Sequence, residues 1–221
     1  LSYRFYDAEL NAERLKRRDL ETALPRAIEK NQFELFYQPI VSLKTGRYWG
    51  FESLVRWRRP GHGMIPPNTF IPTLEDMGLI IPLGQKLLLD SCVAASKWPG
   101  SKHVAVNVSP IQLASDDVID HIRAALAASN LKPNRLTIEV TESVLLGEGA
   151  IERLRSIRDL GVSIALDDFG TGFASMSYLQ TYPYQKIKID RSFVANMSDP
   201  KSQAIVTATI NLAQALKIET T

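Results

Sequence analysis

Five apolar segments of the chain each place a carboxylate, an amide or a lysine inside the run or at its end. They span residues 50–57, 103–109, 136–143, 162–172 and 186–193. A polar side chain inside such a run is costly to bury unless a metal, a partner charge or a ligand compensates it. Five such segments in series are hard to explain as independent accidents, so the sequence predicts that their polar side chains share one site.

Strands and helices are expected to alternate along most of the chain. Apolar and alternating runs predict strands at 33–41, 47–57, 103–108, 135–140, 162–167 and 185–190. Helical spacing predicts helices at about 68–77, 82–97, 115–129, 148–160, 173–181 and 201–216. This order indicates an α/β fold with a parallel sheet. Polar groups at successive strand ends, and no GxGxxG after the first strand, favour a TIM-like (β/α)8 barrel over an open sheet.

Local signals add detail at the N-terminal end. Residues 7–30 have helical spacing, but Pro25 predicts two helices meeting near Leu24. The first two strands are separated by a KTG turn in which Gly46 can adopt a positive φ, so a hairpin is expected. Residues 59–67 are rich in Gly and Pro and predict a loop, after which Asn68 is expected to cap the next helix.

Composition excludes several classes of protein. The 221 residues are 45% hydrophobic and 23% charged, which suits one soluble domain. A net charge of +2, with no basic tract beyond RLKRR, argues against binding duplex nucleic acid. Cys92 is the only cysteine and is expected to be buried. No apolar stretch is long enough for a membrane span, and the N-terminus does not resemble a signal peptide, so a cytoplasmic location without direct membrane insertion is expected.

In a barrel, the C-terminal ends of the strands meet at one rim. The side chains expected there are Glu52, Asn107, Glu139, Asp167, Asp168, Lys188 and Asp190. Carboxylate and amide oxygens favour Mg²⁺ or Mn²⁺ over zinc. The adjacent pair Asp167 and Asp168 can serve two cations, and two cations about 3.5–4 Å apart are the usual device for in-line phosphodiester chemistry. The FGTGF that follows can approach a phosphate or form a lid.

Each of these residues also has an ordinary structural interpretation. Arg56 lies four residues after Glu52 on the same strand face and could hold a phosphate, and Gln38 could touch a base or another ligand. The structural alternatives are a turn residue for Asn107, a helix cap for Glu142 and for Asp190, a solvated residue for Lys188, and an ion pair with Arg56 for Glu52.

The segments FYQPIVSLKTGRYWGFESLVRW, NVSP, IEVTES, LDDFGTGFASMSYL and KIKIDRSFV, in this order and spacing, resemble the EAL domain, the bacterial cyclic di-GMP phosphodiesterase family. The resemblance covers about residues 20–221. It implies a barrel with an antiparallel first strand. It also implies hydrolysis of one phosphodiester bond of cyclic di-GMP to linear pGpG, dependence on two Mg²⁺ or Mn²⁺ ions, and inhibition by calcium.

The resemblance also implies roles for individual residues. Metal ligands would be Glu52, Asn107, Glu139 and Asp167, with Asp168 and Asp190 at the second metal. Lys188 would position or deprotonate the attacking water, Glu142 would tether the DDFGTG loop, and Gln38 and Arg56 would contact the nucleotide. Ser53 replaces the alanine of the Glu-Ala-Leu motif, a small change that we expect to be tolerated.

The two ends of the chain depart from the family pattern. The family's AEGVE segment and its last strand are absent after LAQALKIETT, which predicts a C-terminally incomplete barrel over residues 19–221. Residues 1–18 resemble the join to a preceding GGDEF domain, so a multidomain, covalently linked sensor is expected, whose parent could be membrane-anchored. A homodimer is a further expectation from the family.

Two other functions remain open from the sequence. The chain could be a regulatory module that binds cyclic di-GMP without cleaving it. Alternatively, it could be an enolase-like barrel enzyme that uses its acids and a lysine base on a carboxylate substrate. The adjacent aspartates and Arg56 argue against the second alternative.

Overall fold

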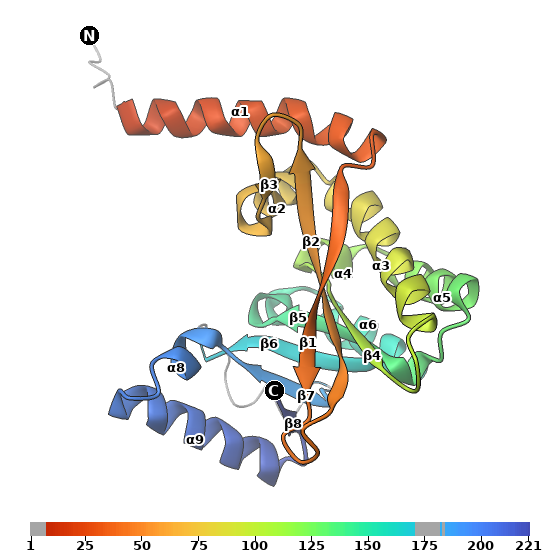
Figure 1. The fold of residues 1–221 in the computed structure, drawn as a ribbon, viewed down its shortest axis with the longest axis vertical. Coiled ribbons are helices and arrows are strands. Elements are labelled where there is room, and N and C mark those ends of the chain that lie inside the picture. The colour runs from red at the N-terminus through yellow and green to blue at the C-terminus, as the bar shows by residue number, and fades with distance from the viewer. Residues whose placement is uncertain (1–7, 171–181, 183) are drawn as a thin grey trace.

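The computed structural model describes residues 8–170, 182 and 184–221. Its strands form one sheet in the order β1-β2-β4-β5-β6-β7-β8, with β3 paired to β2 (Figure 1). Their bounds are β1 (Phe33–Val41), β2 (Tyr48–Arg59), β3 (Gly63–Ile65), β4 (His103–Asn107), β5 (Leu136–Thr141), β6 (Ser163–Phe169), β7 (Lys186–Ile189) and β8 (Glu219–Thr220). Strand β2 is antiparallel to β1 and β3, and the pairs from β2–β4 to β7–β8 are parallel.

Helix α1 (Ala8–Glu29) precedes the first strand, and the other helices lie in the connections between parallel strands. They are α2 (Pro67–Asp76), α3 (Ile80–Ser96), α4 (Pro110–Ala114), α5 (Val118–Ser129), α6 (Ala150–Asp159), α8 (Arg191–Ala195) and α9 (Pro200–Ala215), with 3-10 turns η1 (Pro133–Arg135) and η2 (Glu142–Leu146). The predicted TIM-like α/β architecture with an antiparallel first strand is confirmed. Within the described residues β1 and β8 are not paired with each other, so the sheet is not closed, as the predicted incomplete barrel requires.

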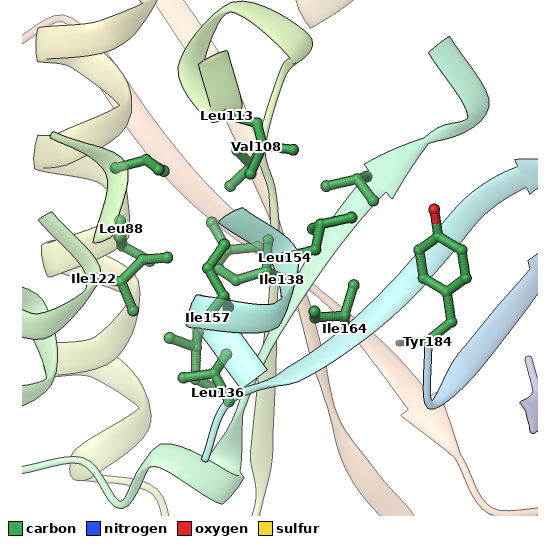
Figure 2. Close-up of a cluster of buried hydrophobic side chains, with 14 of the residues drawn as sticks. Leu88, Val108, Leu113, Ile122, Leu136, Ile138, Leu154, Ile157, Ile164 and Tyr184 are labelled. Carbon is green, nitrogen blue, oxygen red and sulfur yellow. The ribbon is translucent and has the colours of Figure 1, made fainter. Parts of the chain in front are cut away.

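The two faces of the parallel strands differ in chemistry because side chains alternate along a strand. One face is apolar and packs against helices α3, α5 and α6, where Ile138 and Ile164 meet Ile122 and Leu154 (Figure 2). The opposite face carries the short and polar residues of the same strands, such as Glu139. The core therefore packs the outer face of the strands against the helices, and the inner face remains available for polar side chains.

A second hydrophobic cluster joins α1 to the barrel. Leu24 of α1 is buried with Trp57 of β2 and Phe70 of α2. Pro25 lies inside α1, which runs unbroken, so the prediction of two helices was wrong. The lost backbone hydrogen bond is offset because the residues around the proline are buried in this cluster. In Figure 1, α1 crosses the far end of the long β1–β2 hairpin.

Several local predictions can be compared with the structure. Gly46 has a φ of 66° in the hairpin turn, and Cys92 is buried, as expected. Asn68 is not the cap of α2, because Pro66 takes that position and Pro67, whose φ is already suited to a helix, starts the first turn. The predicted loop contains β3. The helix predicted at 173–181 lies outside the described residues.

None of the helices in the described parts of the chain is long and apolar enough to cross a membrane.

Candidate metal centre at the barrel rim

Three carboxylates from different strands meet around one lysine. Lys188 Nζ on β7 lies 2.7 Å from Glu139 Oε2 on β5, 3.0 Å from Asp167 Oδ2 on β6 and 3.1 Å from Glu52 Oε2 on β2. One ligand oxygen of each acid lies within 4.8 Å of the others. Residues up to 136 positions apart in the chain are thus in contact, as the topology predicts.

Asn107 joins this group from β4, because its Nδ2 donates to Glu52 Oε1 at 2.9 Å. Glu52 therefore contacts both Asn107 and Lys188. The alternative in which Glu52 pairs with Arg56 is not observed, since the guanidinium of Arg56 donates to the carbonyl of Val55. Lys188 is not a solvated strand residue either, because only 16% of its side chain is exposed.

Asp168 and Asp190 form a neighbouring group. The backbone at Asp168 has a φ of 53°, and its N–H donates to Asp167 Oδ1 at 2.9 Å, which turns the two adjacent aspartates apart. Asp190 caps α8 by accepting from the N–H of Ser192, so its structural interpretation is observed. A side-chain hydrogen bond with Asp168 contributes, after those from Ser192, to a lowered pKa of Asp190. The acids therefore fall into two adjacent sets.

Glu142 lies at the start of η2 and reaches the loop after β6. Its Oε1 accepts from the N–H of Gly170 at 3.0 Å. Gly170 has a φ of 100°, which favours glycine, and it is the first residue after Phe169 at the end of β6. The contact anchors Gly170, the last described residue of the DDFGTG segment, and the next two residues of that segment lie outside the described residues.

Gln38 and Arg56 lie on the β1–β2 hairpin. Gln38 is exposed and stands directly opposite Glu52 in the antiparallel register, so both side chains lie on one face of the hairpin. Arg56 lies four residues further along β2, two strand repeats from Glu52, and is opposite Glu34. The structure brings Gln38 beside the carboxylates and leaves Arg56 at a greater distance along the strand.

The electrostatics of the rim follow from burial. Burial raises the pKa of Glu139 to about 8, although the charge of Lys188 opposes the shift. Burial disfavours the charge on Lys188, but the carboxylates of Glu139, Asp167 and Glu52 outweigh it and raise the pKa of the ammonium. Burial, followed by the charges of Asp167 and Asp190, raises the pKa of Asp168. Three acids around one cation leave negative charge uncompensated.

The donor set fits a hard divalent cation. The oxygens of Glu52, Glu139 and Asp167, with the amide of Asn107, are the ligand types that Mg²⁺ and Mn²⁺ prefer. None of the rim groups in the described residues is a cysteine or histidine. Asp168 and Asp190 offer further oxygens next to this set.

A cavity of about 530 Å³ opens beside the rim. Asn107 and Glu139 line it together with apolar and small side chains from β2 and helices α2, α3 and α4. The sequence did not single out its Glu75 or Ser109. At the contact between α3 and α4, a side chain at Gly84 would meet the amide of Gln112 at 1.9 Å, so the Gln112 side chain, which accepts from the N–H of Ser109, would have to move.

Comparisons with known proteins agree with this geometry. The EAL domain family model matches residues 21–221. MucR of Pseudomonas aeruginosa, a bifunctional diguanylate cyclase and cyclic di-GMP phosphodiesterase, is 36% identical over 98% of this chain and 33% of its own length. The chain spans 26% to 33% of the lengths of the first curated relatives that it matches.

Solved structures give the same result. The PaMucR phosphodiesterase in complex with c-di-GMP has a TM-score of 0.87 at 36% identity, covering 91% of this chain and 85% of that chain. The EAL enzyme Bd1971, bound to cAMP and cyclic-di-GMP, has a TM-score of 0.89 at 35% identity, covering 94% of this chain and 59% of that chain. On the fold, the rim and the family model together, this chain belongs to the EAL domain family.

Proposed function

We propose that this chain hydrolyses cyclic di-GMP to linear pGpG with the help of two Mg²⁺ or Mn²⁺ ions held at the rim. The observation that carries the proposal is the convergence of Glu52, Glu139 and Asp167 from three strands onto one point. Its family relatives include a cyclic di-GMP phosphodiesterase, which supports the choice of substrate.

In this proposal Glu52, Asn107, Glu139 and Asp167 hold one ion, and Asp168 and Asp190 complete the site of the second. Bound cations of this kind polarise a phosphoryl oxygen and lower the pKa of water at the site. The chain's own residues orient the reaction. Lys188 lies within hydrogen-bond reach of all three acids, so its ammonium can hold the attacking water against them; after losing a proton to solvent, its neutral amine could instead accept a proton from that water.

The rest of the site binds and orients the dinucleotide. The cavity of about 530 Å³ lies within the usual range for a small-molecule site, and its mainly apolar walls suit the face of a base. Gln38, opposite Glu52, and Arg56 are proposed to contact the nucleotide, with Arg56 facing a phosphate. Glu142 is proposed to keep the loop after β6 in place through Gly170.

A second candidate is a module that binds cyclic di-GMP and does not cleave it. Solved structures of relatives with cyclic di-GMP bound support it, since they record binding of the dinucleotide by EAL domains. The family membership leaves no support for the enolase-like alternative.

The deciding experiment is chromatographic detection of pGpG after incubation with cyclic di-GMP and Mg²⁺ or Mn²⁺. Product that requires the metal supports hydrolysis. Tight binding of cyclic di-GMP without product, in the presence of either metal, supports the binding module and removes the catalytic roles.

Three features of the parent protein belong to the proposal as well. Residues 1–18 are proposed to join a GGDEF or other sensor domain to the EAL domain that follows, and the chain is proposed to act in the cytoplasm. A homodimer is supported by exposed apolar side chains on and beside α8 and α9, namely Val194, Met197 and Ile205. Sedimentation velocity with and without cyclic di-GMP tests the dimer.

A further inference from the structure

Below the rim, the barrel interior contains a second polar cluster, which we call the floor cluster. It consists of Trp49 on β2, His103 on β4, Lys186 on β7 and Glu219 on β8. Lys186 Nζ lies 3.1 Å from the centroid of the Trp49 ring, and the imidazole of His103 stacks on that ring at 4.0 Å with an interplanar angle of 11°. Lys186 Nζ also lies 3.4 Å from Glu219 Oε2.

A β-bulge places Trp49 in this cluster. In the β1–β2 register Ile40 faces Gly50 and Val41 faces Tyr48, so Trp49 is the extra residue. A bulge re-aims side chains, and here it turns Trp49 onto His103 and Lys186. Next to the bulge, Gly50 lets β2 approach β4 closely, because a Cβ there would lie 2.3 Å from the carbonyl oxygen of His103.

The contact between Trp49 and Lys186 spans the sheet. Strands β4, β5 and β6 lie between β2 and β7 in the pairing order, so no backbone hydrogen bond sets the separation of β2 from β7 directly. These two strands also carry Glu52 and Lys188, three and two residues further along. The side chain of Lys186 is only 12% exposed. Its carboxylate partner Glu219 is 72% exposed, whereas Trp49 is half-buried, so of the two partners the indole is better shielded from water.

We propose that Trp49 and Lys186 are positioning residues, whose contact fixes β2 against β7 and thereby holds Glu52 in contact with Lys188. The inference rests on the proposed function, because that function gives the geometry of the rim a role in catalysis. Neither residue touches the substrate or the metals in this proposal. Their effect reaches the reaction only through Glu52 and Lys188.

The test compares Lys186→Met, which keeps most of the length of the side chain but removes its charge, with Lys132→Met, a matched change at an exposed lysine. We expect Lys186→Met to weaken Mn²⁺ binding in calorimetry and to lower kcat, each by about 10-fold or more, as for residues that orient metal ligands. The melting temperature of the metal-free protein should stay close to that of Lys132→Met. Trp49→Phe, which keeps an aromatic face, should retain most of the function that Trp49→Leu loses.

A third readout is independent of metal and turnover. In the metal-free wild type, the Lys188 ammonium held by three carboxylates should give a slowly exchanging ¹⁵Nζ–H resonance, assigned by its absence in Lys188→Arg. We expect this resonance to be lost in Lys186→Met and kept in Lys132→Met. If the wild type neither hydrolyses cyclic di-GMP nor binds Mn²⁺, the proposed function fails, while loss of the resonance in Lys186→Met still supports the positioning role.

Two results would overturn the inference. One is a Lys188 resonance that persists in Lys186→Met, with Mn²⁺ affinity and kcat within about twofold of the control. The other is a large fall in melting temperature with unchanged kcat per folded molecule, which would make the floor cluster a structural element only.

Discussion

Two layers of the same barrel interior balance charge differently. At the rim, Glu52, Glu139 and Asp167 surround the single ammonium of Lys188. In the floor cluster, Lys186 faces one carboxylate and an aromatic ring. Neighbouring positions on the same strands thus build one layer with excess negative charge and one that is nearly neutral. The comparison teaches that a buried layer with uncompensated charge is suited to bind a metal, whereas a layer that balances its charges internally is suited to hold the strands in position.

The largest expected effect is on turnover at the rim. Glu52→Ala removes a proposed metal ligand and a partner of both Asn107 and Lys188, so kcat for cyclic di-GMP should fall by about 10³-fold. Circular dichroism should show an unchanged fold. Glu29→Ala, at an exposed glutamate of α1, serves as the control and should keep full activity. Retained turnover in Glu52→Ala would remove Glu52 from the metal site.

The second effect is on stability and contrasts the two lysines. Lys188→Met leaves three buried or half-buried acids without a cation, and should destabilise the metal-free protein by about 3–5 kcal/mol. Lys186→Met should cost far less, because its acidic partner Glu219 is exposed to water. Urea unfolding measures both variants. Mn²⁺ should restore part of the stability of Lys188→Met. Equal losses in the free energy of unfolding for the two variants would contradict the predicted difference between rim and floor.

The two layers should also respond to pH with opposite slopes. Burial raises the pKa of Glu139 from 4.5 to about 8, so between these values the folded protein holds a proton that the unfolded chain has lost. The Glu139 contribution to the stability of the metal-free protein should therefore fall by up to about 5 kcal/mol as pH rises through this range.

For His103 the sign is reversed. Burial, with the charges of Lys186 and Arg135, lowers the pKa of His103 from 6.5 to about 4, so the unfolded chain binds the extra proton. Its contribution should rise with pH across that range, by about 1 kcal/mol after allowance for partial exposure. Urea unfolding from pH 4 to 8 in EDTA, with Glu139→Gln and His103→Phe, separates the two slopes. If Glu139→Gln leaves the fall in stability with pH unchanged, or His103→Phe leaves the rise unchanged, the assignment of that slope to the residue is contradicted.

The smallest effect is expected outside the barrel. Arg59 holds Asp19 of α1 through two hydrogen bonds of 2.6 Å each, but 54% of the Asp19 side chain is exposed. Asp19→Asn should therefore change stability by only about 0.5–1 kcal/mol and leave turnover unchanged. Thermal unfolding at low and high salt checks it. A loss as large as that of Lys188→Met would show that water does not weaken this pair.

The strands could largely be predicted from the sequence, because one face of each packs on helices and leaves an apolar pattern. The rim could be predicted from polar residues that interrupt this pattern, and the structure brings Glu52, Asn107, Glu139, Asp167 and Lys188 together. The roles of these residues came from the family resemblance.

Other features depend on contacts distant in sequence. Helix α1 continues through Pro25 because tertiary burial outweighs a local signal. The bulge at Trp49 follows from the register of β2 with β1, and the need for glycine at position 50 follows from the carbonyl of His103; neither contact is visible in a local pattern. Lys186 differs from a solvated strand residue through the aromatic ring of β2 and the carboxylate of β8 that the fold brings to it.

The most direct test of the contrast between rim and floor is anomalous scattering from crystals grown with Mn²⁺. We predict manganese peaks bounded by Glu52, Asn107, Glu139 and Asp167, with a second beside Asp168 and Asp190, and no peak in the floor cluster. Crystals that show no manganese at the rim at saturating concentration, or manganese beside Lys186, would contradict the proposal that uncompensated charge at the rim builds the metal centre.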